Sequence, residues 1–577
     1  MNHVLFGAPR IIIGSSLALW MCLGSIAFGQ WSTGPAPEVY LIHQGAAEVL
    51  SDLKVVMDLT APEEQKQYKK LLDHLELTLP GVDRDRPLRT DLLLNPKPYR
   101  MRTWIPVSNE RTFWRNNLMP NGIGQQAQVI PGLIYKLSGN VYPYFLWLEH
   151  GYGQFVEVHQ EDGDQVVTDF VAIKPAGQGG PGDPMNALAA KGYEFGLEGT
   201  NKPGHIEDRE KLFFGPDGHK ESILATHRKL KTEEQDLYDL NHLAFSVQLD
   251  EVGRIFTQGQ HLVVNGLLDE DRKQGIMDAK LVALPGTPLQ ASMESMGSKT
   301  TRFATIPRSA EPVLSLRMNL FLDEMRQRGY LAILDQLRKV AINGINTKSQ
   351  RTAAQKTALV TAANQMYGLA QKTLSAGSAI GMIEMQPDGQ YHTAVAAMQV
   401  ANGQDAMEIL KTLQGAGSDL EVKFDVAKFG DVSVHSYDLD SSVRETYKAL
   451  VGTNTIYVGI EANAVWLAGG PNALKALETA IGQAQPTQGT EEFLSIAGRF
   501  GPWFAARQKV QGDKLVEPFR TQHRLAVEAA QPGDDRFNLS LKRDGQDLLA
   551  KVNLDSGVLR WLGKSLAHMA KEQIPEK

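Results

Sequence analysis

The strongest chemical motif in the chain is a glycine-rich stretch that begins at Gly177. Residues 177–182 match the pattern G-x-G-x-x-G, and Glu198 follows 21 residues after the first glycine. In dinucleotide-binding proteins such a loop lets the backbone approach a pyrophosphate, and a later acid binds the ribose. Here Pro181 and Pro184 lie in the turn, and no alternating series of strands and helices surrounds it. We therefore favour a flexible loop and expect no cofactor.

Aromatic residues are concentrated between positions 99 and 155, where eleven of 57 residues are aromatic, compared with 7% in the whole chain. Rows of exposed aromatic rings bind sugars or peptides by stacking. Residues 141–148 are apolar on both faces of a predicted strand, which is typical of a strand buried on both sides, so a core role is favoured. The residues that could contact a ligand are Trp104, Trp114, Tyr142, Tyr144, Trp147 and Tyr152.

Histidines, acidic residues and serines lack the spacings that define common metal or catalytic sites. Glu149-His150 and Glu157-Val158-His159 bring imidazoles near carboxylates, but neither H-x-x-x-H nor H-E-x-x-H occurs. The G-x-S-x-G pattern does not occur either. No metal site is expected and no catalytic residue is assigned, although a serine–histidine–carboxylate site assembled from distant positions stays open.

The first 29 residues have the features of a secretory signal peptide. Arg10 precedes an apolar run at 11–28, and Ala27 and Gly29 place small residues three and one positions before a cleavage site at Gly29/Gln30. We therefore expect a periplasmic or extracellular protein. An uncleaved anchor is the alternative, because the run approaches the length that spans a bilayer. No second run of this kind follows, so no transmembrane segment is expected after cleavage.

Composition excludes several classes of function. The only cysteine is Cys22, inside the signal peptide, so the mature chain would carry no disulfide, cysteine–zinc site, iron–sulfur cluster or cysteine nucleophile. The formal net charge is −7, without any run of five like charges, which argues against nucleic acid as a partner. Contents of 42% hydrophobic and 22% charged residues are typical of globular proteins.

The elements that must position any site are predicted to be β-hairpins followed by helices. Pairs of strand-like segments are joined by turn residues such as Pro387-Asp388-Gly389. Hairpins are expected at 378–385/391–400, 421–427/432–439, 455–461/464–468 and 536–543/547–554, with a less regular copy at 90–95/99–107. This pattern predicts an α+β fold of repeated hairpin–helix units, with mainly antiparallel sheets and helices on one face.

Two long helical segments interrupt this pattern. They are predicted at 319–340 and 349–374 and are expected to form an antiparallel pair in the C-terminal half. Residues 285–288 and the polar segment 292–301 are the candidate linker. The expected organisation is a signal peptide at 1–29, one or more N-terminal α+β domains at 30–300, and a C-terminal α+β domain at 301–577.

Several short segments carry a resemblance to a known group. Gly81-Val82-Asp83, Arg86-Pro87-Leu88 and Ile105-Pro106-Val107-Ser108 resemble the N-terminal region of uncharacterised exported proteins common in planctomycete bacteria. Residues 456–460 and 465–470 are similar to the late strand–strand–helix of the same group. The resemblance covers most of the mature chain and implies a repeated α+β fold and an exported location. It brings no catalytic residue.

The sequence favours an exported envelope protein with a binding or structural role and without catalysis. Its unknown partner would be an envelope protein or a polysaccharide. The alternative is a secreted or periplasmic hydrolase that acts on polysaccharide or peptide through two carboxylates about 5–10 Å apart in a pocket. A self-assembling envelope component that uses its sheet edges is a third hypothesis.

Overall fold

The computed structural model shows an α+β protein that divides into two compact units. It describes residues 38–76, 79–93, 100–113, 115, 126–130, 134–137, 144–149, 151–157, 192–229, 234–348, 351–417, 421–439, 441–511, 517 and 519–573. Unit 1 contains residues 216–255 and 285–550, and unit 2 contains the described residues of 38–215, 256–284 and 551–573. The expected domains at 30–300 and 301–577 stay a prediction.

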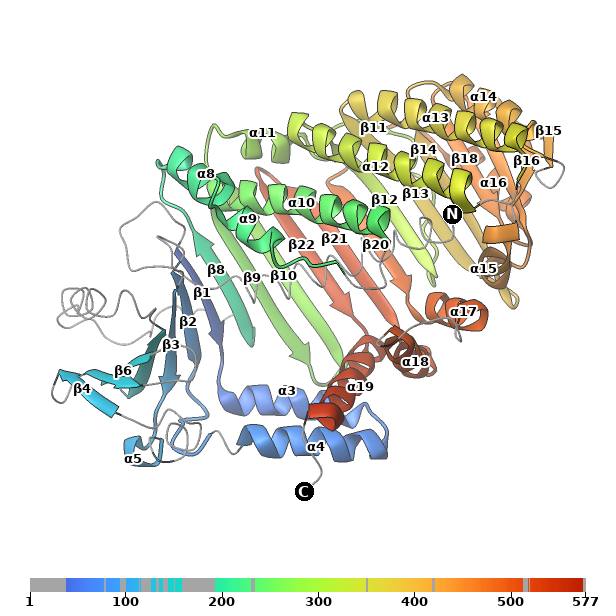
Figure 1. Cartoon of the computed structure of the whole chain (residues 1–577). Coiled ribbons are helices and arrows are strands. Elements are labelled where there is room, and N and C mark those ends of the chain that lie inside the picture. The colour runs from blue at the N-terminus through green and yellow to red at the C-terminus, as the bar shows by residue number, and fades with distance from the viewer. Residues whose placement is uncertain are drawn as a thin grey trace. The chain divides into compact units, whose positions relative to one another are not determined.

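Unit 1 is built on one antiparallel sheet. Its strands are β12 (Leu314–Phe321), β13 (Ser378–Asp388), β14 (Tyr391–Gln399), β15 (Val422–Phe429), β16 (Val432–Asp438), β17 (Thr455–Glu461), β18 (Ala464–Gly469), β20 (Glu492–Arg499) and β21 (Arg536–Asp544). They pair in the order β21–β20–β12–β13–β14–β18–β17–β16–β15 (Figure 1). The strands β11 (Thr300–Thr301) and β19 (Thr487–Gln488) form a separate short ladder. β22 (Asp547–Leu554) follows β21, and its last residues belong to unit 2.

Tight turns close the hairpins of unit 1. Gly389 joins β13 to β14 with φ +63°, and Gly430 joins β15 to β16 with φ +60°. Glycine adopts this left-handed conformation without steric cost, so these positions suit two-residue hairpin turns. Pro387 is still part of β13 and pairs with His392. The turn is therefore shorter than the five residues expected from the sequence.

Helices cover the sheet of unit 1 on both faces. They include α9 (His219–Leu224), most of α10 (Gln235–Gln258), α11 (Pro288–Ser295), α12 (Glu324–Lys348), α13 (Ala353–Ser375), α14 (Gly403–Gln414), α15 (Ser441–Val451), α16 (Ala473–Gln483), α17 (Gly501–Gln511) and α18 (Phe519–Ala530). On one face α16 packs around Trp466, which has 0% of its surface exposed. On the other, α14 packs against Val458 and Ile460. The expectation of helices on one face is wrong for this unit, because successive side chains of β17 and β18 enter different cores.

Two further expectations need correction. Residues 319–321 continue β12, so the first long helix begins at Glu324; Asn319 donates its side-chain amide to the carbonyls of Gly297 and Lys299, which fixes it in the sheet. The candidate linker contains α11, which is capped by Thr287. Leu289 and Met293 of that helix are buried, so the segment contributes to the core.

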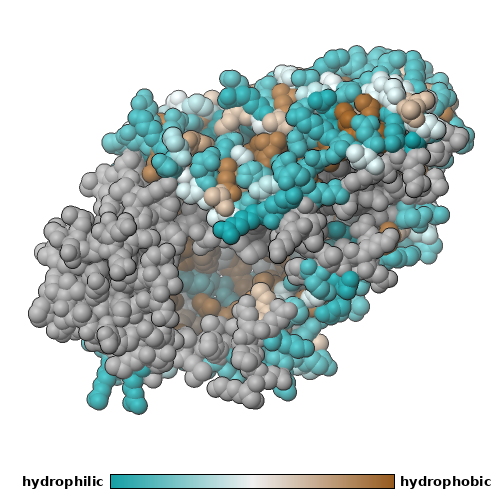
Figure 2. Space-filling model, viewed as in Figure 1, coloured by the Kyte–Doolittle hydropathy of each residue, from teal (hydrophilic) through white to brown (hydrophobic). Residues whose placement is uncertain are grey.

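The helices α12 and α13 pack against each other. Figure 2 shows a largely hydrophilic surface over these helices, with small hydrophobic patches between the polar groups. Tyr330 of α12 and Met366 of α13 are exposed large apolar side chains of this unit. Most of the apolar residues of α12 are only partly buried.

Unit 2 also contains one antiparallel sheet. Its strands are β1 (Glu38–His43), β2 (Leu88–Leu93), β3 (Arg100–Pro106), β4 (Gln126–Ile130), β5 (Ile134–Leu137), β6 (Tyr144–Glu149), β7 (Tyr152–Glu157), β8 (Phe195–Thr200), β9 (Gly259–Asp269) and β10 (Gln274–Ala283). They pair in the order β10–β9–β8–β1–β2–β3–β7–β6–β5–β4 (Figure 1).

The helices of unit 2 are α3 (Ala46–Asp58), α4 (Pro62–Glu76), α5 (Glu110–Phe113), α8 (Ile206–Phe214) and α19 (Ser556–Gln573). Val56, Tyr68 and Ala567 form a buried cluster that joins α3, α4 and α19. Among the helices that the structure describes, we find none that combines the length and the apolar character needed to cross a lipid bilayer.

Candidate functional site

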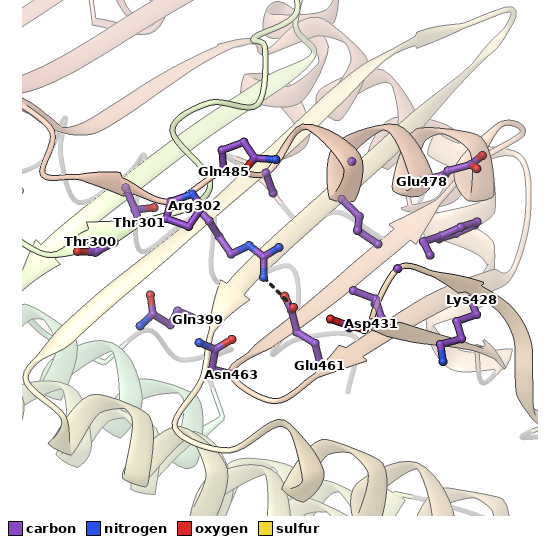
Figure 3. Close-up of a pocket in the computed structure, with 17 residues that line it drawn as sticks. Thr300, Thr301, Arg302, Gln399, Lys428, Asp431, Glu461, Asn463, Glu478 and Gln485 are labelled. Carbon is purple, nitrogen blue, oxygen red and sulfur yellow. Dashed lines mark hydrogen bonds and ion pairs between the residues drawn. The ribbon is translucent and has the colours of Figure 1, made fainter.

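The candidate site is a cavity of about 870 Å³ in unit 1 (Figure 3). Its wall consists of residues 300–302, the turn between β15 and β16, the turn between β17 and β18, and the C-terminal end of α16 with residues 484–486. Strand ends and turns therefore form the wall, while the sheet and α16 hold these turns in place. Polar side chains that line it include Arg302, Gln399, Asp431, Glu461, Asn463 and Glu478.

An ion pair between Arg302 and Glu461 forms one side of the cavity. Arg302 Nη1 lies 2.7 Å from Glu461 Oε2, and the two side chains point toward each other in Figure 3. The indole Nε1 of Trp466 donates a hydrogen bond of 3.0 Å to Glu461 Oε1. Both carboxylate oxygens therefore accept hydrogen bonds from fixed donors. Glu461 is 11% exposed and Arg302 is 31% exposed, so the pair lies between the core and the cavity.

The local sequence explains why Glu461 and Trp466 meet. Glu461 ends β17, Trp466 lies in β18, and a two-residue turn joins the strands. Gly459 lies opposite Trp466, and a Cβ atom at Gly459 would come within 3.1 Å of the Cβ of Trp466 and within 2.9 Å of Val432. A side chain at Gly459 would therefore crowd both Trp466 and Val432. The Phe303 ring contacts Trp466 edge-on at 5.5 Å between centroids, which fixes the chain next to Arg302.

The rest of the cavity combines hydrogen-bonding groups with apolar surface. Lys428, Asp431 and Glu478 are exposed, whereas Phe429 and Ile481 are partly buried and pack against the core around Trp466. Arg302 Nε is buried and has no hydrogen-bond partner among the described atoms. Such a cavity can hold a small polar ligand with both donor and acceptor groups.

Glu198, the acid considered for ribose binding, lies in β8 and belongs to a different network. The hydroxyl of Tyr40 donates to Glu198, and His261 Nε2 lies 2.6 Å from Glu198 Oε1. Burial raises the pKa of Tyr40, and the hydrogen bond to Glu198 and its charge raise it further. These contacts link β1, β8 and β9. The glycine-rich residues 177–182 lie outside the described residues.

The predicted aromatic contacts are described only in part. Trp104 is partly buried and donates a 3.0 Å hydrogen bond from Nε1 to Asp91 Oδ2, and Asp91 also pairs with Arg89 at 2.5 Å. Tyr152 is 5% exposed and lies edge-on to Trp104 with ring centroids 6.4 Å apart. Tyr144 and Trp147 belong to β6, but their side chains lie outside the described part of the structure, as do Trp114 and Tyr142 entirely.

Three carboxylates of unit 2 could hold a metal ion. Glu48, Asp52 and Glu194 each offer an oxygen atom, and these atoms lie within 4.8 Å of one another. Burial raises the pKa of Asp52 to about 7, and the charges of Glu194, Glu48 and Glu270 add to this effect. Burial also raises the pKa of Glu194, although the backbone N–H of Leu268 donates to it and opposes the shift. Oxygen ligands of this type suit Ca²⁺ or Mg²⁺.

Comparisons with protein-family models, with curated proteins and with solved structures found no match. The cavity is therefore interpreted from its own geometry. Sequence reasoning did not find Arg302 or Glu461, because they are 159 residues apart and neither belongs to a spaced motif. The available signal was the position of both residues beside predicted turns or linkers.

Proposed function

We propose that the protein is an exported envelope protein that binds a polysaccharide without cleaving it, and that the cavity of unit 1 holds one segment of the ligand. The observation that carries this proposal is the Arg302–Glu461 pair in a cavity that also contains the amides of Gln399 and Asn463. Guanidinium, carboxylate and amide groups are planar and offer donors and acceptors in fixed directions. Neighbouring hydroxyl groups of a sugar ring can bind such groups in pairs.

The charges of the cavity support an uncharged ligand. Two cationic side chains, Arg302 and Lys428, face three carboxylates, and one cation is already paired with Glu461. A strongly anionic chain would meet the carboxylates of Asp431 and Glu478 and lose affinity through repulsion. A neutral saccharide avoids this cost and uses both kinds of group.

Size and apolar surface support the same class of ligand. The volume of about 870 Å³ lies within the range of small-molecule sites, roughly 300–1,000 Å³. Phe429 and Ile481 provide apolar contacts in the lining. The C–H faces of a sugar ring pack against such surfaces, while its hydroxyl groups reach the polar side chains.

Export is supported by the signal-like residues 1–29, and a binding role is supported by the antiparallel hairpins and helices that form a scaffold around the turns of the cavity. We infer that these turns carry the ligand contacts, while the helices and strands of unit 1 supply the core. This arrangement separates the binding surface from the elements that hold the fold together.

Hydrolysis is the second candidate, because Asp431, Glu461 and Glu478 line the same cavity. Glu461 already accepts hydrogen bonds from Arg302 and Trp466, which makes it part of the wall. A hydrolase would then need Asp431 and Glu478 as its acid and base. Loss of turnover in Asp431→Asn or Glu478→Gln, with binding retained, would favour this function over the proposed one.

Binding of neutral and acidic polysaccharides to the purified protein, measured by affinity electrophoresis and calorimetry, tests the proposal. We expect a neutral glycan to bind, with affinity reduced at least tenfold by Asn463→Ala or Gln399→Ala. The matched control is Gln386→Ala, since Gln386 is an exposed amide outside the cavity. Equal affinity in the cavity variants and the control, or no glycan binding at all, would contradict the proposal.

A further inference from the structure

A second cavity of unit 1, about 460 Å³ in volume, lies between the segment that follows α9 and the first turns of α10. His227 and His242 both line it. Their Nδ1 atoms lie 3.2 Å apart and therefore face each other. Two neutral imidazoles in this position share one proton in an N–H···N hydrogen bond, or both direct lone pairs at a cation placed between them.

The separation of the two nitrogen atoms suits a bound metal ion. In a tetrahedral site with metal–nitrogen bonds of 2.0–2.1 Å, two ligand nitrogens are about 3.3 Å apart. We propose that His227 and His242 form a binding site for a divalent transition-metal ion such as Cu²⁺ or Zn²⁺. Imidazole nitrogen favours these ions, whereas Ca²⁺ and Mg²⁺ prefer oxygen ligands. The proposal does not depend on polysaccharide binding at the other cavity.

Neighbouring aromatic residues hold both imidazoles in place. The Tyr238 hydroxyl donates a 3.0 Å hydrogen bond to the carbonyl of His227, and the Tyr238 ring is nearly parallel to the His227 ring, at 6°. The Phe245 ring lies 5.5 Å from that of His227. Tyr238 and His242 are four residues apart on α10 and lie on one helix face. Tyr238 is thus a positioning residue that orders the ligands before the metal binds.

Two histidines leave coordination positions open. Glu221 also lines the cavity, but among the described residues no carboxylate oxygen joins the two imidazoles within 4.8 Å. The volume leaves room for water molecules at the open positions. Arg228 and Lys229 also line the cavity, and their positive charges attract an anion toward the open positions. The same charges weaken the binding of a free cation, so we expect micromolar rather than nanomolar affinity.

The test measures Cu²⁺ and Zn²⁺ binding to the whole protein by calorimetry, and Cu²⁺ coordination by electron paramagnetic resonance. By calorimetry we expect one binding site of micromolar affinity, and an affinity at least tenfold lower in His227→Ala and in His242→Ala. In the Cu²⁺ spectrum we expect hyperfine coupling to two imidazole nitrogens. Tyr238→Phe keeps the ring but loses the hydrogen bond to His227, so a smaller loss of affinity is expected. His205→Asn is the control, because His205 is exposed and lies outside this cavity.

Two results would overturn the proposal. The first is unchanged affinity for Cu²⁺ in the folded double variant His227→Ala/His242→Ala. The second is a Cu²⁺ spectrum of the unmodified protein without coupling to two nitrogens. This second measurement needs no variant, so it decides the question even when the substitutions prevent folding.

Discussion

Arg302 Nη1 lies 2.7 Å from Glu461 Oε2, and this ion pair is one of the contacts that join the wall of the larger cavity to the core of unit 1. The same carboxylate accepts a hydrogen bond from the fully buried Trp466, whose ring contacts Phe303. The geometry of the cavity is therefore linked to the packing beneath it. A change at Glu461 is expected to affect both ligand binding and the free energy of unfolding.

Replacing Glu461 with glutamine tests this link. Glu461→Gln removes the negative charge from a mostly buried pair and leaves the Arg302 guanidinium with a neutral partner. Because hydrogen bonds to charged groups contribute about 1.5–3 kcal/mol, we expect the free energy of unfolding to fall by about 1–2 kcal/mol. Urea unfolding followed by tryptophan fluorescence measures this change.

The control for this prediction is Glu408→Gln. Glu408 pairs with Lys411 on α14, but both side chains are more than half exposed, at 60% and 57%. Exposed pairs of this kind contribute about 0–1 kcal/mol, so the control is expected to unfold almost like the unmodified protein. Equal losses in the two variants would show that the Arg302–Glu461 pair has no special role in stability.

The carboxylate cluster formed by Glu48, Asp52 and Glu194 predicts that the stability of the protein depends on pH. The pKa of Asp52 is about 7 in the folded protein, against 3.8 for an ordinary aspartate. Between these values the folded state binds more protons at this site than the unfolded state, so stability falls as pH rises from about 4 to 7. The Asp52→Asn variant has no such proton, and we expect its melting temperature to fall less over this range.

Differential scanning fluorimetry from pH 4.5 to 7.5 measures the effect. Asp58→Asn is the matched control, because Asp58 is an exposed residue of the same helix. Burial also raises the pKa of Glu194. In Asp52→Asn we therefore expect part of the decrease of melting temperature with pH to persist. If the melting temperatures of the unmodified protein and of Asp52→Asn changed with pH in parallel, the pH dependence could not be assigned to Asp52.

His435 predicts a loss of stability in acid. Its side chain is fully buried, and burial lowers its pKa, with a smaller opposing effect from Asp425. Below pH 6.5 the unfolded state takes up a proton at this site more readily than the folded state, so stability is lost as pH falls through this region. Asp425 N donates to His435 Nδ1 at 3.0 Å, and an asparagine side chain can replace that acceptor.

His435→Asn is therefore expected to show two effects. At pH 7.5 the smaller buried side chain should lower the free energy of unfolding by about 1–2 kcal/mol. Between pH 6.5 and 5 the further loss should be smaller than in the unmodified protein, because asparagine does not titrate. Chemical unfolding at several pH values measures both, and an unchanged slope in acid would assign the acid sensitivity to other groups.

Much of the local structure of unit 1 could be predicted from the sequence. The hairpin predicted at 455–461/464–468 is found as β17 and β18, with one more residue at the end. Alternating apolar residues and the turn at Ala462-Asn463 were sufficient, because both are local signals. Asn319 is a residue for which the sequence was not sufficient. The sequence predicts a helix there, but hydrogen bonds from its side-chain amide to the carbonyls of Gly297 and Lys299 hold the residue in β12. Tertiary contacts decided that boundary.

The candidate sites could not be predicted in the same way. Arg302 and Glu461 are 159 residues apart, and His227 and His242 are 15 residues apart. Spacing motifs detect ligands that share one helix turn or one loop, and none of these pairs does. Their meeting depends on strand order and helix packing, which a single sequence does not specify.

At Gly470, next to the core of unit 1, the backbone conformation and the close neighbours predict that substitution by any other residue destabilises the protein. Its φ is +117°, and a Cβ atom there would lie 2.4 Å from the carbonyl oxygen of His392 and 2.7 Å from the Cα of Thr393. Gly389 has φ +63°, but a Cβ atom at that position would meet no other atom within 4 Å. Gly389→Ala should therefore cost only the strain of a left-handed residue, about 1–2 kcal/mol. Gly470→Ala adds a clash with backbone, so we expect a loss of about 3 kcal/mol or more in urea unfolding. Equal losses in the two variants would show that β14 moves easily and that the packing around Gly470 is loose.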